Sequence, residues 1–153
     1  MAEARTLREE AVRLLSGVEP AIRTWPRDVY VVGIPTRFRV DNFVPVTEGA
    51  ATTNVQVAAT ATPFKSVWTF GDVTVTCAFA GKEFAGKDDD APDACKHTFH
   101  RSTAGERRSA TVQVHYHVVW GSNLFPEVRP LPDIVSVPHT FDYQVKSYEA
   151  IIR

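Results

Sequence analysis

The stretch Val67-Trp68-Thr69-Phe70-Gly71-Asp72 decides the fold of this 153-residue chain. Cys77 follows shortly after it, and Cys95-Lys96-His97-Thr98-Phe99 lies further along. We interpret these residues as a tryptophan-bearing strand, a tight Gly-Asp turn, a second strand, a loop closed by two cysteines and a return strand. The order is typical of an antiparallel sheet in a protein that carries a disulfide bond.

Two cysteines permit one intrachain disulfide, Cys77–Cys95. Closing a loop of this length stabilises a fold by about 3 kcal/mol in the chain-entropy model. A structural disulfide indicates an oxidising compartment, so we expect an extracellular or cell-envelope protein. The alternatives are a redox or metal-binding pair, which is normally more closely spaced, and two buried free thiols in a cytosolic protein.

Composition describes an ordinary globular chain, with 44% hydrophobic and 23% charged residues. The net charge of −1 gives no reason to expect nucleic acid or an anionic membrane as partner. No apolar run reaches the roughly 20 residues that cross a bilayer. The charged N-terminal segment does not resemble a signal peptide, so for a secreted protein we expect a mature or trimmed form.

One helix is predicted, over residues 3–16, with a capping box formed by Thr6 and Glu9 and a C-terminal cap at Gly17. Its apolar face comprises Leu7, Ala11, Leu14 and Leu15. Residues 18–27 are interpreted as an extended connector. We therefore divide the chain into an N-terminal helix and connector, 1–27, and a β-domain, 28–153.

The remaining chain alternates apolar and polar residues with period two, as expected for antiparallel strands packed on one core. Predicted core positions are Val55, Val57, Ala59, Ala61, Val112, Val114, Tyr116, Val118 and Trp120. Residues 121–138 hold four of the ten prolines and are predicted to be a long loop. About seven strands with one core favour an all-β antiparallel sandwich of immunoglobulin type with a short N-terminal helix.

Trp68-Thr69-Phe70-Gly71-Asp72 resembles the W-x-F-G-D-G signature of polycystic-kidney-disease (PKD) domains. The layout of residues 28–150 is similar to small PKD-like secreted proteins of actinobacteria. Those proteins carry a G-L-P-T motif, here Gly33 to Thr36, and a C-x-H-T-Y segment, here Cys95 to Phe99. The resemblance implies a PKD-like sandwich and a location outside the cytoplasm. The second glycine of the turn is replaced by Val73, which implies a reshaped turn.

Histidines provide the first candidate site. His115 and His117 leave the same face of a predicted strand, and His97, His100 and His139 could join them as zinc or copper ligands. The alternative is a pair of half-exposed histidines on a polar sheet face, which we favour. No cofactor is therefore predicted.

Charged loops provide two further candidates. Asp88, Asp89 and Asp90 could coordinate calcium, or form a solvated acidic loop tip, which we favour because the EF-hand spacing is missing. Arg101, Arg107 and Arg108 could bind an acidic partner or a sulfated glycan. The alternative for these arginines is a soluble turn without a ligand.

No G-x-S-x-G elbow, P-loop or dinucleotide-binding glycine pattern is present, and Ser102 near His100 has no placed acid. We therefore expect a non-catalytic secreted or cell-surface module that binds protein or glycan. One alternative is a structural subunit of an extracellular envelope, pilus-like or particle assembly, with contacts through the helix and residues 121–138. The other is a metal-binding protein or enzyme that uses His115 and His117.

Overall fold

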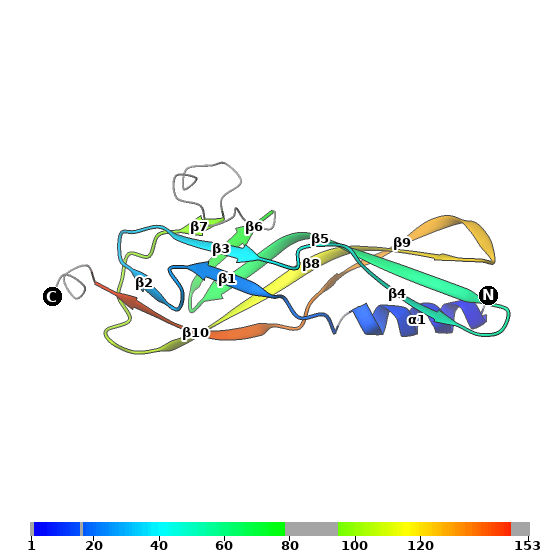
Figure 1. Ribbon diagram of the computed structural model, residues 1–153, viewed down its shortest axis with the longest axis horizontal. Coiled ribbons are helices and arrows are strands. Elements are labelled where there is room, and N and C mark those ends of the chain that lie inside the picture. The colour runs from blue at the N-terminus through cyan, green and yellow to red at the C-terminus, as the bar shows by residue number, and fades with distance from the viewer. Residues whose placement is uncertain (1, 16, 79–94, 148–153) are drawn as a thin grey trace. The chain divides into compact units, whose positions relative to one another are not determined.

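A computed structural model describes residues 2–15, 17–78 and 95–147 of the chain (Figure 1). It is mostly β-strand with one short N-terminal helix, α1 (Ala2–Leu15), which confirms the predicted class at that level. The described strands are β1 (Ile22–Trp25), β2 (Val29–Val31), β3 (Thr36–Val40), β4 (Val46–Ala51), β5 (Gln56–Phe70), β6 (Val73–Cys77), β7 (Lys96–His97), β8 (Arg108–Ser122), β9 (Phe125–Val135) and β10 (His139–Lys146).

The strands form two sheets. One has the order β1-β3-β7, and the other has the order β2-β10-β8-β5-β4, with β6 beside β5 and β9 beside β8. The pairings β1–β3, β3–β7, β4–β5, β5–β6, β8–β9 and β8–β10 are antiparallel. β2 and β10 run parallel, so the larger sheet is mixed where the sequence predicted an antiparallel one.

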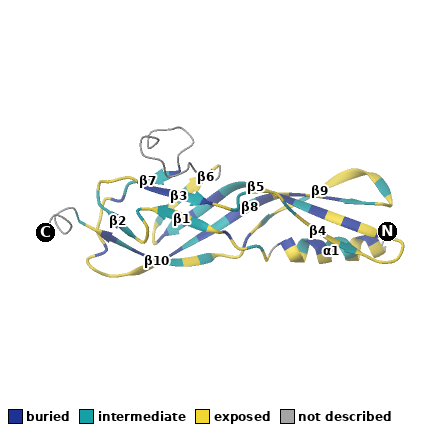
Figure 2. Ribbon diagram, in the orientation of Figure 1, coloured by how far each residue is buried: buried dark blue, intermediate teal, exposed yellow. Residues whose placement is uncertain are grey.

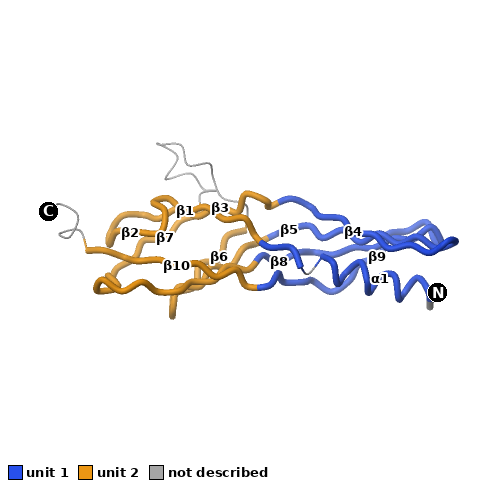
Figure 3. The backbone as a smooth tube through the Cα atoms, turned by 60° about the horizontal axis from the view of Figure 1, so that its bottom comes forward, with its two compact units in different colours: residues 1–19, 44–64, 114–137 blue, residues 20–43, 65–113, 138–153 orange. Residues whose placement is uncertain are grey.

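The chain divides into two compact units (Figure 3). Unit 1 comprises residues 1–19, 44–64 and 114–137, and unit 2 comprises residues 20–43, 65–113 and 138–153. β5 and β8 contribute residues to both units. The domain boundary predicted between residues 27 and 28 stays a prediction.

In unit 1, helix α1 contacts β4 and buries Ala4, Ala11 and Leu15. Leu14, which was predicted on the buried face, is 40% exposed. The capping box at Thr6 is also wrong, because α1 already begins at Ala2 and Thr6 lies inside the helix. Glu3 in the first turn suits the positive end of the helix dipole, so the helix has a favourable start further upstream than predicted.

The predicted alternation along β5 and β8 is confirmed, and it can be followed in Figure 2. The residues predicted to face the core, 55, 57, 59 and 61 on one segment and 112, 114, 116, 118 and 120 on the other, are all buried. The alternating strand expected over residues 53–61 and the tryptophan-bearing strand expected before the Gly71-Asp72 turn belong to one continuous strand, Gln56–Phe70, which runs through Pro63. Pro63 falls between the segment that pairs with β4 and the segment that pairs with β6, so neither pairing needs its missing N–H.

Residues 121–138 do not form the predicted long loop. β8 continues to Ser122, a turn at Asn123-Leu124 follows, and β9 then runs from Phe125 to Val135 opposite β8. In the described sheet β9 pairs with β8 alone, so it is an edge strand. Prolines are tolerated there because an edge strand has one side without ladder partners, and the prediction gave them too much weight as strand breakers.

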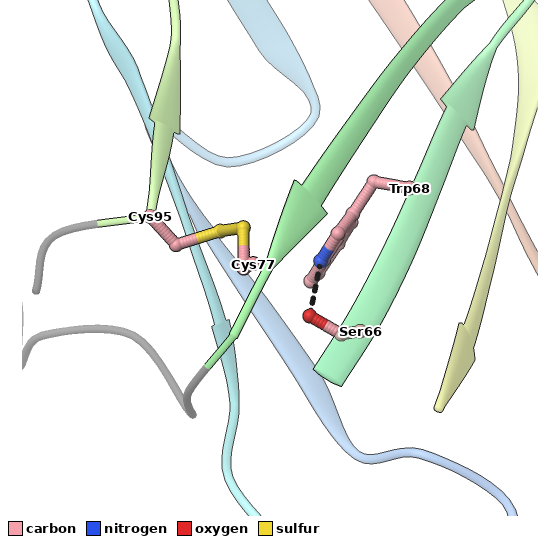
Figure 4. Close-up of a disulfide and its surroundings, with 4 residues drawn as sticks. All are labelled: Ser66, Trp68, Cys77 and Cys95. Atoms are coloured by element: carbon pink, nitrogen blue, oxygen red, sulfur yellow. Dashed lines mark hydrogen bonds between the residues drawn. A yellow bond between two sulfur atoms is a disulfide. The ribbon is translucent and has the colours of Figure 1, made fainter. Parts of the chain in front are cut away.

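Aromatic side chains from both sheets form the core of unit 2. The Phe38 ring on β3 lies 4.9 Å from Trp68 and 5.4 Å from Phe70 on β5, measured between ring centroids. Trp68 is completely buried, and its indole Nε1 donates a hydrogen bond of 2.9 Å to Ser66 Oγ (Figure 4). This bond satisfies the one polar group of the buried indole, which would otherwise be costly to bury.

The Cys77–Cys95 disulfide is present, as predicted, with 5.7 Å between the Cα atoms (Figure 4). Cys77 ends β6 in the larger sheet. Cys95 precedes β7, and its carbonyl accepts a hydrogen bond from Phe38 N on β3 in the smaller sheet. The bond therefore joins the two sheets of unit 2 beside the aromatic core.

Replacing Cys77 and Cys95 together by alanine should lower the free energy of unfolding by about 3 kcal/mol, because the unfolded chain regains the entropy of the open loop. Urea unfolding followed by tryptophan fluorescence measures this loss. Reductant should lower the urea midpoint of unfolding of the wild-type protein and leave the midpoint of the double variant unchanged. Equal midpoints for the oxidised wild-type protein and the double variant would contradict the stabilising role.

Candidate functional site

A hollow in unit 2, of about 580 Å³, brings together residues that the sequence analysis singled out separately. We call it the cationic hollow. Its lining side chains are Arg101 and Arg108, His97 and His100, Asp72, and a set of apolar and hydroxyl residues: Phe70, Val73, Phe99, Ser102, Thr103, Tyr143 and Val145. At neutral pH its two arginines outnumber its one carboxylate, so it favours an anionic group.

The apolar part of this hollow consists of buried rings. Phe70 contacts Phe99 edge to face with 5.2 Å between ring centroids, and Tyr143 lies 5.1 Å from Phe70. The His97 ring meets Phe99 edge to face at 4.8 Å. Edge-to-face packing of this kind fixes ring orientation, so the hollow has a rigid lining.

The loop that carries Arg101 is held in place by backbone hydrogen bonds. Gly33 N donates to the Phe99 carbonyl at 3.0 Å, and Thr103 N donates to the Val145 carbonyl on β10 at 2.9 Å. Val145 N in turn donates to the buried Thr103 Oγ1 at 3.2 Å. Ala104 adopts a positive φ of 54° in the turn that follows. A bound anion would therefore meet an arginine on an already ordered loop.

Two pKa shifts describe the environment in the hollow. Burial lowers the pKa of His97 below its usual 6.5, and the neighbouring His100 lowers it further. Burial raises the pKa of Tyr143, an effect that Arg108 opposes and Asp72 strengthens. Arg108 also lies 3.8 Å from Glu106, an exposed pair that leaves its guanidinium accessible to a ligand.

Arg107 does not join its neighbours in the hollow. Its Nη2 donates to Asp28 Oδ2 at 2.9 Å, and this ion pair holds the pKa of Asp28 below its usual value. The structure thus separates the three predicted arginines into two that line the hollow and one with an acidic partner elsewhere in unit 2.

Ser102 and His100 both line the hollow but do not form a nucleophile–base pair among the described residues. Ser102 Oγ instead accepts a hydrogen bond of 3.3 Å from Ala104 N. A serine needs a base within hydrogen-bonding distance to become a nucleophile.

His115 and His117 lie on the other candidate surface, on β8 in unit 1. The Phe64 ring stacks on His117 with 3.8 Å between centroids and 7° between planes, and it meets His115 edge to face at 6.2 Å. His117 Nδ1 is 2.9 Å from Asp133 Oδ1 on β9. His117 thus contacts an aromatic ring and a carboxylate, and its side chain remains 61% exposed.

Within residues 2–15, 17–78 and 95–147, no three His, Cys, Asp or Glu side chains gather as metal ligands would. His97, His100 and His139 belong to unit 2 and His115 and His117 to unit 1. The metal-site hypothesis for His115 and His117 stays a prediction. Asp88, Asp89 and Asp90, the calcium candidates, lie outside the described residues.

Comparison with family models, with curated proteins and with solved structures finds no match to this chain. The functional argument therefore depends on the geometry of the described residues. In those residues, no helix has the length and apolar character needed to cross a bilayer.

Several residues of these surfaces were missed by the sequence analysis. It gave no site role to Tyr143, Phe64 or Asp133. The only signal in the sequence was the position of each residue in the two-residue alternation of its strand. This signal becomes useful once the register between neighbouring strands is known. The described register of β8 with β9 places Val135 opposite His115, and Asp133 two positions away on the same strand.

Stability should fall below neutral pH, partly through His97. Because its folded pKa lies below the usual 6.5, the unfolded chain binds this proton more readily. The contribution of neutral His97 is complete above pH 6.5 and is lost as the pH falls through the folded pKa. The variant His97→Gln should show a shallower decline of urea midpoint between about pH 7 and pH 5. Identical declines in both proteins would refute the assignment.

Proposed function

We propose that this chain is a secreted or cell-surface, non-catalytic β-sandwich module that binds an anionic group on a protein or glycan. The observation that carries the proposal is the cationic hollow. Arg101, on a loop fixed by backbone hydrogen bonds, and Arg108, at the start of β8, line this hollow together with buried aromatic rings. Guanidinium groups bind carboxylate, sulfate and phosphate with two parallel hydrogen bonds, which suits both acidic peptides and sulfated sugars.

The location outside the cytoplasm is supported by the disulfide. It joins two sheets across the core of unit 2, a structural role that requires a compartment in which the bond persists. The PKD-like sandwich is the proposed finer fold. It is supported by the buried Trp68 beside the disulfide and by the turn at Gly71, which has a φ of +62°.

The double variant Arg101→Ala/Arg108→Ala should bind a heparin-derived hexasaccharide, or a polyglutamate peptide, at least about tenfold more weakly than the wild-type protein. Each charged hydrogen bond contributes about 1.5–3 kcal/mol, and about 1.4 kcal/mol corresponds to tenfold in affinity. Titration calorimetry measures this change. Wild-type affinity should also fall as salt is raised.

Arg107→Ala is the control, because it removes one arginine charge from a residue that is adjacent to Arg108 in the chain but lies outside the hollow. It should change affinity by about twofold or less. Equal losses for Arg107→Ala and for the double variant would show a nonspecific charge effect. Absence of binding to both anionic probes would contradict the proposal.

A second candidate, a structural subunit of an extracellular assembly, is favoured by a groove in unit 1. Helix α1 and β9 form it with Val12, Leu131, Pro132 and Ile134 among its lining residues, and its volume is about 410 Å³. These are the two segments that the sequence analysis assigned to assembly contacts. The occupant would be a second copy of the chain.

Sedimentation velocity over a range of concentrations tests this candidate. Self-association that is lost in Leu131→Asp would support a structural subunit. A monomer at all concentrations would leave the binding module as the function.

A further inference from the structure

A second hollow in unit 2 shares no lining residue with the cationic hollow. Its volume is about 700 Å³, and we call it the Trp25 hollow. The lining residues that matter here are Trp25, Arg27, Asp28, Tyr30, Phe141 and Asp142. They come from β1, β2 and β10 and the chain between β1 and β2, which the sequence analysis did not connect.

Trp25 differs from the other tryptophans of the chain. Trp25 is 55% exposed, whereas Trp68 and Trp120 are 0% and 5% exposed. No hydrogen bond or ring contact joins the Trp25 side chain to another described residue. An exposed indole presents a flat apolar face to water at the side of a hollow, which suits a ligand with a flat C–H face.

Tyr30 provides an independent observation. Its ring is completely buried and stacks on Phe99 at 5.5 Å, yet its hydroxyl has no hydrogen-bond partner among the described residues. Burial raises the pKa of Tyr30 to about 12, so the hydroxyl keeps its proton. Thr24, whose hydroxyl donates to the Arg27 carbonyl, moderates that rise in the pKa of Tyr30.

A buried hydroxyl without a partner costs about 1–3 kcal/mol, so a ligand that accepts its hydrogen bond gains correspondingly. Tyr30, Asp28 and Trp25 line the same hollow. The orphaned hydroxyl and the exposed indole therefore belong to one hollow.

The charges around this hollow balance. Arg23 and Arg27 contribute two positive charges, and Asp28 and Asp142 contribute two negative ones. Asp28 is oriented by Arg107, and Asp142 Oδ1 accepts a hydrogen bond of 3.3 Å from Ser109 Oγ. Carboxylates that are fixed in this way keep lone pairs that can accept hydrogen bonds from hydroxyl groups. The balance of positive and negative side chains favours an uncharged ligand.

We propose that the Trp25 hollow binds a neutral pyranose ring of a glycan. Trp25 stacks on the C–H face of the sugar, Tyr30 Oη donates to a sugar oxygen, and Asp28 and Asp142 accept from sugar hydroxyls. This inference names a ligand class for the proposed binding module and therefore depends on that proposed function.

The test is protection of Trp25 from acrylamide quenching, because the other two tryptophans are buried and contribute little to the quenchable fluorescence. The probes are cellohexaose, maltohexaose and mannohexaose at millimolar concentration. At least one should protect the wild-type protein in a saturable manner. Tyr30→Phe keeps the ring packing and should weaken that affinity by about three- to tenfold, the effect of one hydrogen bond.

Tyr116→Phe, a change to a buried tyrosine of unit 1, is the matched control and should leave affinity unchanged. Trp25→Ala should abolish sugar binding when measured by calorimetry, with far-UV circular dichroism to establish that the variant is folded. A Trp25→Tyr variant should retain part of the sugar binding. Equal affinities for wild-type and Trp25→Ala protein would overturn the inference.

Failure of all three neutral sugars to protect Trp25 overturns the inference as well. If the sulfated hexasaccharide still binds through Arg101 and Arg108, the proposed function stands and only the sugar site falls. Absence of binding to the neutral and the anionic probes alike would refute both the sugar site and the proposed function. Protection by a proline-rich peptide but by no sugar would identify a protein-binding surface and overturn the saccharide assignment.

Discussion

The packing of aromatic side chains between the two sheets of unit 2 is the interaction on which the rest of that unit depends. Phe38 on the smaller sheet contacts Trp68 and Phe70 on the larger one, and the Cys77–Cys95 disulfide joins the same two sheets. The outer members of this core also serve the surface. Phe70, Phe99 and Tyr143 line the cationic hollow, and Tyr30 and Phe141 line the Trp25 hollow. Both candidate sites are thus extensions of one rigid core, which limits the entropy lost when a ligand binds.

The two hollows differ in charge although they share this support. Arginines outnumber carboxylates in the cationic hollow, while positive and negative side chains balance in the Trp25 hollow. A module with these two surfaces can recognise an anionic group and an uncharged ring on one ligand or on two.

The sequence allowed the β-rich class, the disulfide and the buried faces of β5 and β8 to be predicted, because period-two alternation over long strands and a single cysteine pair leave little ambiguity. It did not allow β9 to be predicted, since proline argues against a strand unless the strand is known to lie at an edge. Trp25 was assigned to a connector because Pro20 and Pro26 flank it. The hollows themselves depend on strand register between segments far apart in the chain, which no local pattern encodes.

The central claim is that the Cys77–Cys95 disulfide, which joins the two sheets of unit 2, forms in the compartment where the protein works. Intact mass of the protein recovered from its native host, alkylated at once and measured with and without prior reduction, tests it most directly. The account predicts no alkylation without reduction, two alkylated cysteines after it, and a mass about 2 Da lower for the untreated protein than for the reduced one. Cysteines that are alkylated without reduction would contradict the disulfide in the cell and, with it, the assignment to an oxidising compartment.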